Sequence, residues 1–208
     1  MRRLAVFASG SGTNFEAIVT ACERGVLDAE VVLMVCDKPG AKVVERAAAH
    51  EVGAFVFAPK QYASKADYER EIVARLDAAG VELVCLAGYM RIIGDELLGA
   101  YGGRIINIHP SLIPKYCGKG FYGKRVHKAV LEGGEKESGA TVHFVDEGVD
   151  TGEIILQEKV PVLEGDTPDE LAARVLKVEH RILAEGLNQI AAKIQVEKMK
   201  SDEKGGKR

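Results

Sequence analysis

The chain has 208 residues, a length that predicts one domain, since domains generally contain about 100–200 residues. Hydrophobic residues make up 47% of the sequence and charged residues 28%, which is typical of a globular protein and not of a disordered one. The 28 basic and 31 acidic side chains give a net charge of −3. This balance argues against a nucleic-acid-binding surface, because such domains are markedly basic.

The four cysteines lie far apart, with no Cys-x-x-Cys pair and no Cys-His spacing suited to zinc, so no metal site is predicted. The apolar run at the start of the chain is too short for a secretory signal. No uncharged stretch approaches the roughly 18 residues that a membrane span requires. Cysteines without a signal peptide favour a reducing compartment, and we therefore expect a cytoplasmic protein with no membrane partner.

Short, continuously apolar runs alternate with helical patterns through the first half of the chain. Strands are predicted at residues 4–8, 31–36, 55–57, 83–87 and 105–108. Between them, helical periodicity is found around residues 15–22, 41–50 and 65–79. This order is typical of an α/β domain with a mostly parallel, twisted sheet and helices on both of its faces.

Two further runs with strand character, residues 140–145 and 154–160, flank a turn-rich segment and predict a hairpin. They bring the expected sheet to about seven strands. Thr167, Pro168 and Glu170 form a helix start, with Thr167 as the N-cap, and this helix is expected to run to Ile194. We predict one domain over residues 1–196 and a charged, disordered tail over residues 197–208.

The first segment that could carry chemistry is Gly10-Ser11-Gly12-Thr13-Asn14, between the first strand and the first helix. Glycines allow a sharp turn, and a helix N-terminus carries partial positive charge, so a phosphate fits there. Phe15 stands where the dinucleotide fingerprint needs a third glycine, and no Gly-Lys-Ser/Thr follows. A lone phosphate is therefore favoured over a dinucleotide, and a plain strand-to-helix turn is the alternative.

The second segment contains Asn107 and His109, two residues apart at the end of a predicted strand. Residues at this spacing point to the same side of a strand, and open α/β sheets bind ligands at the carboxyl ends of their strands. An amide beside an imidazole suits acyl transfer, since one stabilises an oxyanion and the other supports proton movement. A buried structural histidine is the alternative.

The third segment, residues 146–152, contains Asp150 in a loop that also holds Asp146 and Glu147. A carboxylate that folds back onto His109 would orient the imidazole and raise its pKa. His143, in the strand before this loop, could join such a network. The alternative is an ordinary solvated turn.

The fourth segment, residues 86–93, is another strand end that enters a turn. Its apolar residues and its one arginine, Arg91, could line a flat aromatic ligand with an acidic tail. Core packing with one surface arginine is the alternative.

Together these segments closely resemble the folate-dependent formyltransferases, and among them the enzymes that act on glycinamide ribonucleotide. The resemblance covers about residues 3–194, and its most specific part is Asn107-Ile108-His109-Pro110-Ser111-Leu112 with Asp150. It implies a Rossmann-related fold and transfer of the formyl group of 10-formyltetrahydrofolate to the amine of glycinamide ribonucleotide, a step of de novo purine biosynthesis. No metal is needed, because the formyl donor is already activated.

The resemblance also implies a role for each part of the site. Asn107, His109 and Asp150 would be catalytic, Gly12, Thr13 and Asn14 would hold the substrate phosphate, and Glu179 would meet the ribose. The folate-binding residues would be Met90, Arg91, Ile92, Ile93, Val145, Glu147 and Val149. The protein would be a monomer or a homodimer, and relatives suggest a cis peptide bond between Ile113 and Pro114.

The loop after Pro114 departs from the family, since many relatives have Pro-Gly where this chain has Cys117-Gly118. Lys119 and Lys124 in this loop could assist an anionic substrate or serve solubility alone. Other readings are a formyltransferase for methionyl-tRNA, a 10-formyltetrahydrofolate deformylase, or a non-catalytic nucleotide-binding module. The tRNA enzymes carry an additional RNA-binding domain and the deformylases a regulatory domain. A nucleotide-binding module has no use for Asn107, His109 and Asp150 together.

Overall fold

The computed structural model describes the backbone of residues 1–205 and the side chains of residues 1–193. Within these residues the strands form one seven-stranded sheet in the order β3-β2-β1-β4-β5-β6-β7. The strands are β1 (Arg2–Phe7), β2 (Ala29–Cys36), β3 (Ala54–Val56), β4 (Leu83–Leu86), β5 (Ile105–His109), β6 (Glu137–Phe144) and β7 (Ile154–Pro161). The helices are α1 (Thr13–Glu23), α2 (Lys42–Ala49), α3 (Lys65–Ala78), α4 (Asp95–Tyr101), α5 (Lys124–Glu132) and α6 (Pro168–Gly205), with a 3₁₀ turn, η1, at Pro59–Gln61.

The sheet is mostly parallel, as the sequence predicts. Neighbouring strands from β3 to β5 run parallel, whereas β6 and β7 form an antiparallel hairpin at one edge. Strands β1, β4 and β5 are nearly continuous in buried apolar residues, because helices cover the sheet on both sides. The expected seven-stranded α/β architecture is confirmed.

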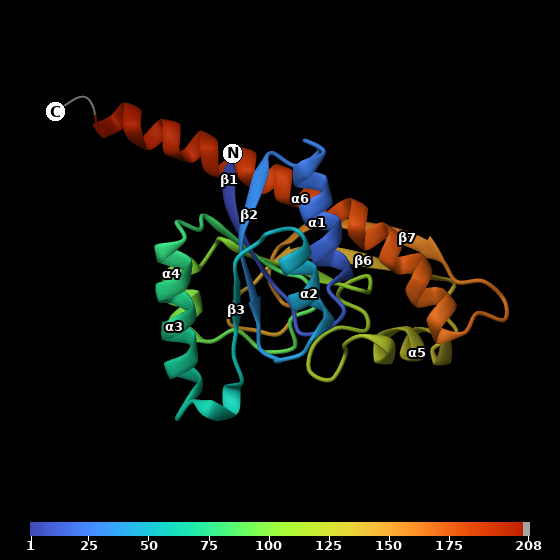
Figure 1. The fold of residues 1–208 in the computed structure, drawn as a ribbon. Coiled ribbons are helices and arrows are strands. Elements are labelled where there is room, and N and C mark those ends of the chain that lie inside the picture. Colours follow the sequence, from blue (N-terminus) through green and yellow to red (C-terminus); the bar gives the residue numbers. More distant parts are fainter. Residues whose placement is uncertain (206–208) are drawn as a thin grey trace.

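Successive residues of β1 divide the hydrophobic core into two layers. Leu4 and Val6 pack in the layer under α1, α2, α5 and α6, whereas Ala5 and Phe7 pack in the layer under α3 and α4. This alternation follows from the two-residue period of a strand. Figure 1 shows α3 and α4 on one side of the sheet and α1, α2 and the long α6 on the other.

The chain builds the sheet outward from β1 in two directions. Strands β2 and β3 are added on one side of β1, and β4 and the later strands are added on its other side. The loops after β1 and β4 therefore leave the sheet on opposite faces and open a crevice at the carboxyl ends of the strands. Open α/β sheets bind ligands at such a point. The adjacent strand β5 ends at the same edge and adds His109.

The antiparallel hairpin carries a third chemical segment to this edge. In the pairing of β5 with β6, Asn107 lies opposite His143, so the two side chains share one face of the sheet. In the pairing of β6 with β7, the register shifts between Val142 and His143, which marks a β-bulge. The loop from β6 to β7 then returns toward β5 and contains Asp150.

Helix α6 begins with the predicted capping box. Thr167 Oγ1 accepts from the N–H of Glu170 at 3.3 Å, and the Glu170 carboxylate accepts from the N–H of Thr167 at 2.8 Å. The helix does not end at Ile194 but continues to Gly205, so the expectation of a disordered segment from residue 197 is wrong for residues 197–205. Lys, Glu and Met in this segment have high helix propensity, which the compositional argument neglected. Residues 206–208 lie outside the described residues.

Helix α4 was not predicted from the sequence. It spans seven residues, Asp95–Tyr101, which is too short for helical periodicity to show. Its start is fixed by α3, because the buried carboxylate of Glu69 accepts from the N–H of Gly94 at 2.8 Å. In the described part of the chain, no helix combines the length and apolarity needed to cross a membrane.

Candidate active site

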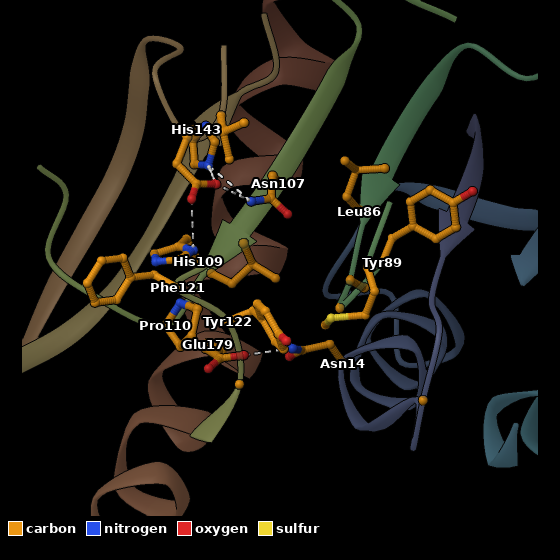
Figure 2. Close-up of a pocket in the computed structure, with 18 of the residues that line it drawn as sticks. Asn14, Leu86, Tyr89, Asn107, His109, Pro110, Phe121, Tyr122, His143 and Glu179 are labelled. Atoms are coloured by element: carbon orange, nitrogen blue, oxygen red, sulfur yellow. Dashed lines mark hydrogen bonds and ion pairs between the residues drawn. The ribbon is translucent and has the colours of Figure 1, made fainter. Parts of the chain in front are cut away.

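A cavity of about 960 Å³ opens where β1, β4 and β5 end. Its walls come from the loops after these strands, the loop before α5, the loop between β6 and β7, and one face of α6. Figure 2 shows Asn107, His109 and His143 gathered at one end of this cavity and Asn14 with Glu179 at the other. Residues more than 150 positions apart in the sequence, such as Asn14 and Glu179, therefore line the same cavity.

The imidazole of His109 is buried and lies between two oxygen atoms. Its Nε2–H donates to the carbonyl oxygen of Tyr116 at 2.9 Å, and its Nδ1 lies 3.5 Å from Oδ2 of Asp150. Burial lowers the pKa of His109, and the charge of Asp150 and the Tyr116 carbonyl offset this only in part. The ring is therefore neutral in the resting site, and Nδ1, the nitrogen that can take up a proton, faces the carboxylate.

Asp150 is the expected partner of His109, and the hairpin loop brings it there. Its Oδ2 also accepts from the N–H of Gly118 at 2.9 Å. Burial by itself would raise the pKa of Asp150, but His143, His109 and the Gly118 N–H together lower it, so the carboxylate is ionised. The backbone φ of 58° is unusual for a residue other than glycine, and such strain is concentrated at functional sites.

Asn107 faces the same carboxylate from β5. Its Nδ2 lies 3.1 Å from Nε2 of His143 and 3.5 Å from Oδ1 of Asp150. His143 Nδ1–H donates to the carbonyl oxygen of Phe144 at 2.7 Å, and its Nε2 faces both the Asn107 amide and Oδ1 of Asp150, the latter at 3.6 Å. The suggestion that His143 belongs to this network is confirmed, and His143 fixes the orientation of the Asn107 amide.

The turn after β1 forms the opposite end of the cavity. Gly12 has φ 73°, and a Cβ added there would lie 2.6 Å from Cγ2 of Val43, so only glycine fits. Gly12 is the N-cap residue of α1 and no side chain caps this helix end, which leaves the first N–H groups of α1 free for an anion. Gly12, Thr13 and Asn14 all line the cavity.

Asn14 and Glu179 form a buried pair beside this turn. Asn14 Nδ2 donates to the Glu179 carboxylate at 2.7 Å, and within the described residues Oδ1 of Asn14 has no hydrogen-bond partner. Burial raises the pKa of Glu179, and the bond from Asn14 opposes this shift. A carboxylate and an unpaired amide oxygen, both next to an anion site, suit the hydroxyl groups of a sugar phosphate.

The loop after β4 supplies an apolar wall. Met90 and Ile92 are 53% and 55% exposed, which is high for such side chains, and both line the cavity. Ile93 also lines the cavity, although most of its side chain is buried in the core layer under α3 and α4. Arg91 is held by Asp37, whose Oδ2 accepts from its Nε at 2.7 Å. All four residues expected from this loop line the cavity, namely Met90, Arg91, Ile92 and Ile93.

The loop between β6 and β7 brings two of its three expected folate-binding residues to the cavity. Val145 and Val149 line the cavity. Glu147 does not, and instead borders a separate shallow hollow with Leu98 and Gly102. An acidic residue in a solvated turn points outward, and the spacing of residues along the loop could not reveal this.

Sequence reasoning missed several residues that line or support the cavity. Asp37 is buried and supports the wall through Arg91 without lining the cavity. It directly follows β2, a position at the sheet edge that could have drawn attention to it. His127, on α5, lines the cavity, and burial lowers its pKa to about 4, so it is neutral. Phe121 and Tyr122, in the loop before α5, also line the cavity. This loop gave no periodic signal, and it follows the expected cis peptide bond at Ile113-Pro114, which is confirmed.

This arrangement suits transfer of an acyl group to an amine. An amide, an imidazole and an ionised carboxylate meet at one end of the cavity. The uncapped N-terminus of α1 and the turn before it lie at the other end, and apolar side chains form a wall. Among the described residues, no cluster of three or more His, Cys, Asp or Glu side chains could hold a metal ion.

Comparison with known proteins agrees with this chemistry. Residues 2–187 match the profile of the formyl transferase family. The chain belongs to this family. A phosphoribosylglycinamide formyltransferase from Bacillus subtilis (strain 168) is 51% identical over 181 residues, which cover 87% of this formyl transferase and 90% of the relative.

Solved structures of the formyl transferase family have the same fold. A glycinamide ribonucleotide transformylase from Geobacillus kaustophilus is 52% identical, with a TM-score of 0.85 over 91% of this chain and 98% of the other. A second transformylase, from Symbiobacterium toebii, is 45% identical, with a TM-score of 0.86 over 90% and 86% of the two chains.

Proposed function

We propose that the protein is a phosphoribosylglycinamide formyltransferase, which transfers the formyl group of 10-formyltetrahydrofolate to the primary amine of glycinamide ribonucleotide in purine biosynthesis. One observation carries this proposal. Asn107, His109 and Asp150 meet in the same cavity that holds the anion-binding turn and Glu179. A formyl donor at one end and a ribonucleotide at the other would bring the two reacting groups together between them.

The ribonucleotide binds with its 5′-phosphate on the turn at Gly12, Thr13 and Asn14. The N-terminus of α1 and its free N–H groups favour a dianion there. Glu179 accepts hydrogen bonds from the ribose hydroxyls, and the unpaired amide oxygen of Asn14 offers a further acceptor. This end of the site therefore recognises the sugar phosphate, and the glycinamide amine extends toward His109.

The folate binds against the wall formed by the loop after β4. Met90, Ile92 and Ile93 present apolar surface to the pterin. Val145 and Val149 approach it from the hairpin loop. Arg91 is half exposed, so it lies within reach of an acidic tail while Asp37 holds it. Glu147 faces away from the cavity and is omitted from this set.

The reaction joins the amine nitrogen to the formyl carbon and breaks the bond from that carbon to N10 of the folate. Negative charge develops on the formyl oxygen as the amine attacks. The second N–H of Asn107, whose contact with Asp150 is long at 3.5 Å, is available to this oxygen. A preorganised donor of this kind lowers the barrier because it requires no reorganisation during the reaction.

The amine loses a proton, and N10 of the leaving folate gains one. His109 is neutral in the resting site and can accept a proton on Nδ1, where Asp150 stabilises the resulting imidazolium. Asp150 is ionised and supplies this charge without itself giving up a proton. The two residues thus hold the proton between its departure from the amine and its arrival at N10.

A cytoplasmic location and a monomeric or homodimeric state are part of this proposal. All four cysteines, which lie in the described part of the chain, are unpaired, as is usual in a reducing compartment.

Incubation with 10-formyltetrahydrofolate, with and without glycinamide ribonucleotide, tests the proposed function. We expect deformylated folate to appear only when the ribonucleotide is present, in a one-to-one ratio with formylated product. Release of formate without the ribonucleotide would indicate a deformylase instead. Absence of any turnover would overturn the proposal.

A further inference from the structure

Helix α2 lies directly behind the anion-binding turn and holds two of its carbonyl groups. The N–H of Val43 donates to the carbonyl oxygen of Gly10 at 3.1 Å. One turn later, Nε–H of Arg46 donates to the carbonyl oxygen of Ser11 at 2.9 Å. Two consecutive peptide groups of the turn are therefore anchored on α2.

These anchors determine where the corresponding N–H groups point. In a planar trans peptide, the C=O and the N–H lie on opposite sides. With the Ser11 carbonyl held by Arg46, the N–H of Gly12 points away from α2, and the same reasoning applies to the N–H of Ser11. Both residues line the cavity, and among the described residues neither N–H has an acceptor in the protein.

Arg46 is itself fixed on its other side. Its Nη1 donates to Oε2 of Glu16 at 2.8 Å, and Oε1 of Glu16 lies 3.0 Å from Nε2 of His50. The Arg46 side chain is only 25% exposed. Since Glu16 belongs to α1, Arg46 bridges α2, the turn and the first turn of α1.

We propose that Arg46 is a positioning residue for substrate phosphate, because it aims the Gly12 N–H into the cavity through its bond to the Ser11 carbonyl. The inference rests on the proposed function in that it places the phosphate on this turn. Arg46 does not touch the phosphate in this role. Its contribution is the geometry of the turn, with its charge as a secondary attraction.

A merely structural role, joining α1 to α2 through Glu16, makes different predictions. It would lower stability and affect both substrates together. A positioning role affects ribonucleotide binding alone, because the folate wall is built from the loop after β4 on the other side of β1. The two roles are therefore separated by comparing the substrates.

The test compares wild type, Arg46→Met, Arg46→Lys and the control Arg70→Met. Methionine keeps the helix propensity and much of the stem but removes every donor, whereas lysine keeps the charge and one donor group. Arg70, on α3 at the opposite face of the sheet, forms surface ion pairs with Asp67 and Glu96 and does not line the cavity. Each protein is titrated with ribose 5-phosphate by calorimetry, and steady-state KM and kcat are measured for both substrates.

We expect Arg46→Met to weaken ribose 5-phosphate binding and raise the ribonucleotide KM about tenfold, because the Gly12 N–H would lose its alignment with a charged acceptor, the phosphate. Its kcat and folate KM should stay within about twofold of wild type, and Arg46→Lys should recover most of the lost affinity. Unchanged ribose 5-phosphate binding in Arg46→Met would overturn the inference. A parallel rise in both KM values would overturn it as well.

The binding measurement also separates this inference from the proposed function. If wild type binds ribose 5-phosphate with the same dependence on Arg46 but transfers no formyl group, the positioning role stands and the activity is wrong. If formyl transfer occurs and Arg46→Met behaves as wild type, the activity stands and the positioning role is wrong.

Discussion

Arg91 donates its Nε–H to the carboxylate of Asp37 across 2.7 Å, and this bond joins the loop after β4 to the end of β2. Oδ1 of the same carboxylate accepts from the hydroxyl of Ser9, and Ser9 Oγ in turn accepts from the N–H of Met90 at 2.8 Å. The ends of three neighbouring strands are tied together in this way. The apolar wall of the cavity therefore rests on a buried carboxylate that contributes no surface to it.

Replacement of Asp37 by Asn should loosen this wall. The variant removes the charge that holds Arg91, and we expect the KM for 10-formyltetrahydrofolate to rise several-fold while the KM for the ribonucleotide stays near wild type. Steady-state kinetics with each substrate varied in turn will measure this. Glu71→Gln is the control, because Glu71 pairs with Arg75 on the surface of α3. Equal folate KM values in Asp37→Asn and wild type would show that the loop holds its shape without the ion pair.

Replacement of Asp150 by Asn should lower kcat by about 10²–10³, the usual effect of removing one electrostatic partner of a transition state. Both KM values should remain close to wild type, because the lost interaction acts on the charge that develops during the reaction. Asparagine also tolerates positive φ, so the backbone at φ 58° can be retained.

Glu147→Gln is the matched control for Asp150, since Glu147 lies in the same loop but outside the main cavity. We expect it to behave as wild type. If Asp150→Asn kept near-normal kcat, His109 would need another partner, and His143 would be the first candidate.

Replacement of Gly12 by Ala should raise the KM for the ribonucleotide far more than the KM for the folate. The added Cβ would clash with Val43, and φ 73° costs a non-glycine residue about 1–2 kcal/mol. Gly99→Ala, on the surface of α4, provides the control, because a Cβ at Gly99 meets no atom within 4 Å and Gly99 does not line the cavity. Kinetics with each substrate will show whether the two variants differ, and similar ribonucleotide KM values would contradict a phosphate at this turn.

The stability of the protein should depend on pH through His50. Hydrogen bonds to Glu16 and then Glu23 raise the pKa of His50 above its usual value near 6.5. A raised folded-state pKa stabilises the protein fully below the unfolded pKa, and this stabilisation is lost as pH rises through the folded value. Because the carboxylates are partly exposed, the contribution is at most about 1 kcal/mol.

Urea unfolding of wild type and His50→Gln at pH 6 and pH 9 measures this effect. The difference in unfolding free energy should be larger at pH 6. This difference in unfolding free energy between wild type and His50→Gln should disappear at both pH values when Glu16 and Glu23 are replaced by Gln. A difference that grew toward pH 9 would mean that the carboxylates do not stabilise the charged imidazole.

The sequence predicted the sheet because its strands are buried on both faces and therefore appear as continuous apolar runs. It predicted Asn107 and His109 for a related reason, since polar residues at the end of such a run lie at the ligand-binding edge. Asp150 could be assigned as the partner of His109 only through the family resemblance, because it lies 41 residues further along the chain. Nothing in the local pattern distinguishes it from Asp146.

Other features could not be predicted because they depend on tertiary packing. Arg46 reads as an ordinary polar residue of a helix, and its bond to the Ser11 carbonyl exists only because α2 packs behind the turn. The helix at residues 197–205 was missed because charged composition was taken to predict disorder. The outward direction of Glu147 likewise follows from how the loop folds.

The bulge between Val142 and His143 determines whether the edge strand β7 can gain or lose residues without disturbing the site. Pairing of β6 with β5 sets the position of His143, whereas β7 contacts β6 across the bulge, where one register slip is already absorbed. The chain can therefore gain or lose a residue in β7 without turning His143 to the other face of the sheet. An insertion or deletion in β7 therefore leaves the reacting side chains in place. One residue inserted in β5 would instead turn its side chains to the opposite face of the sheet.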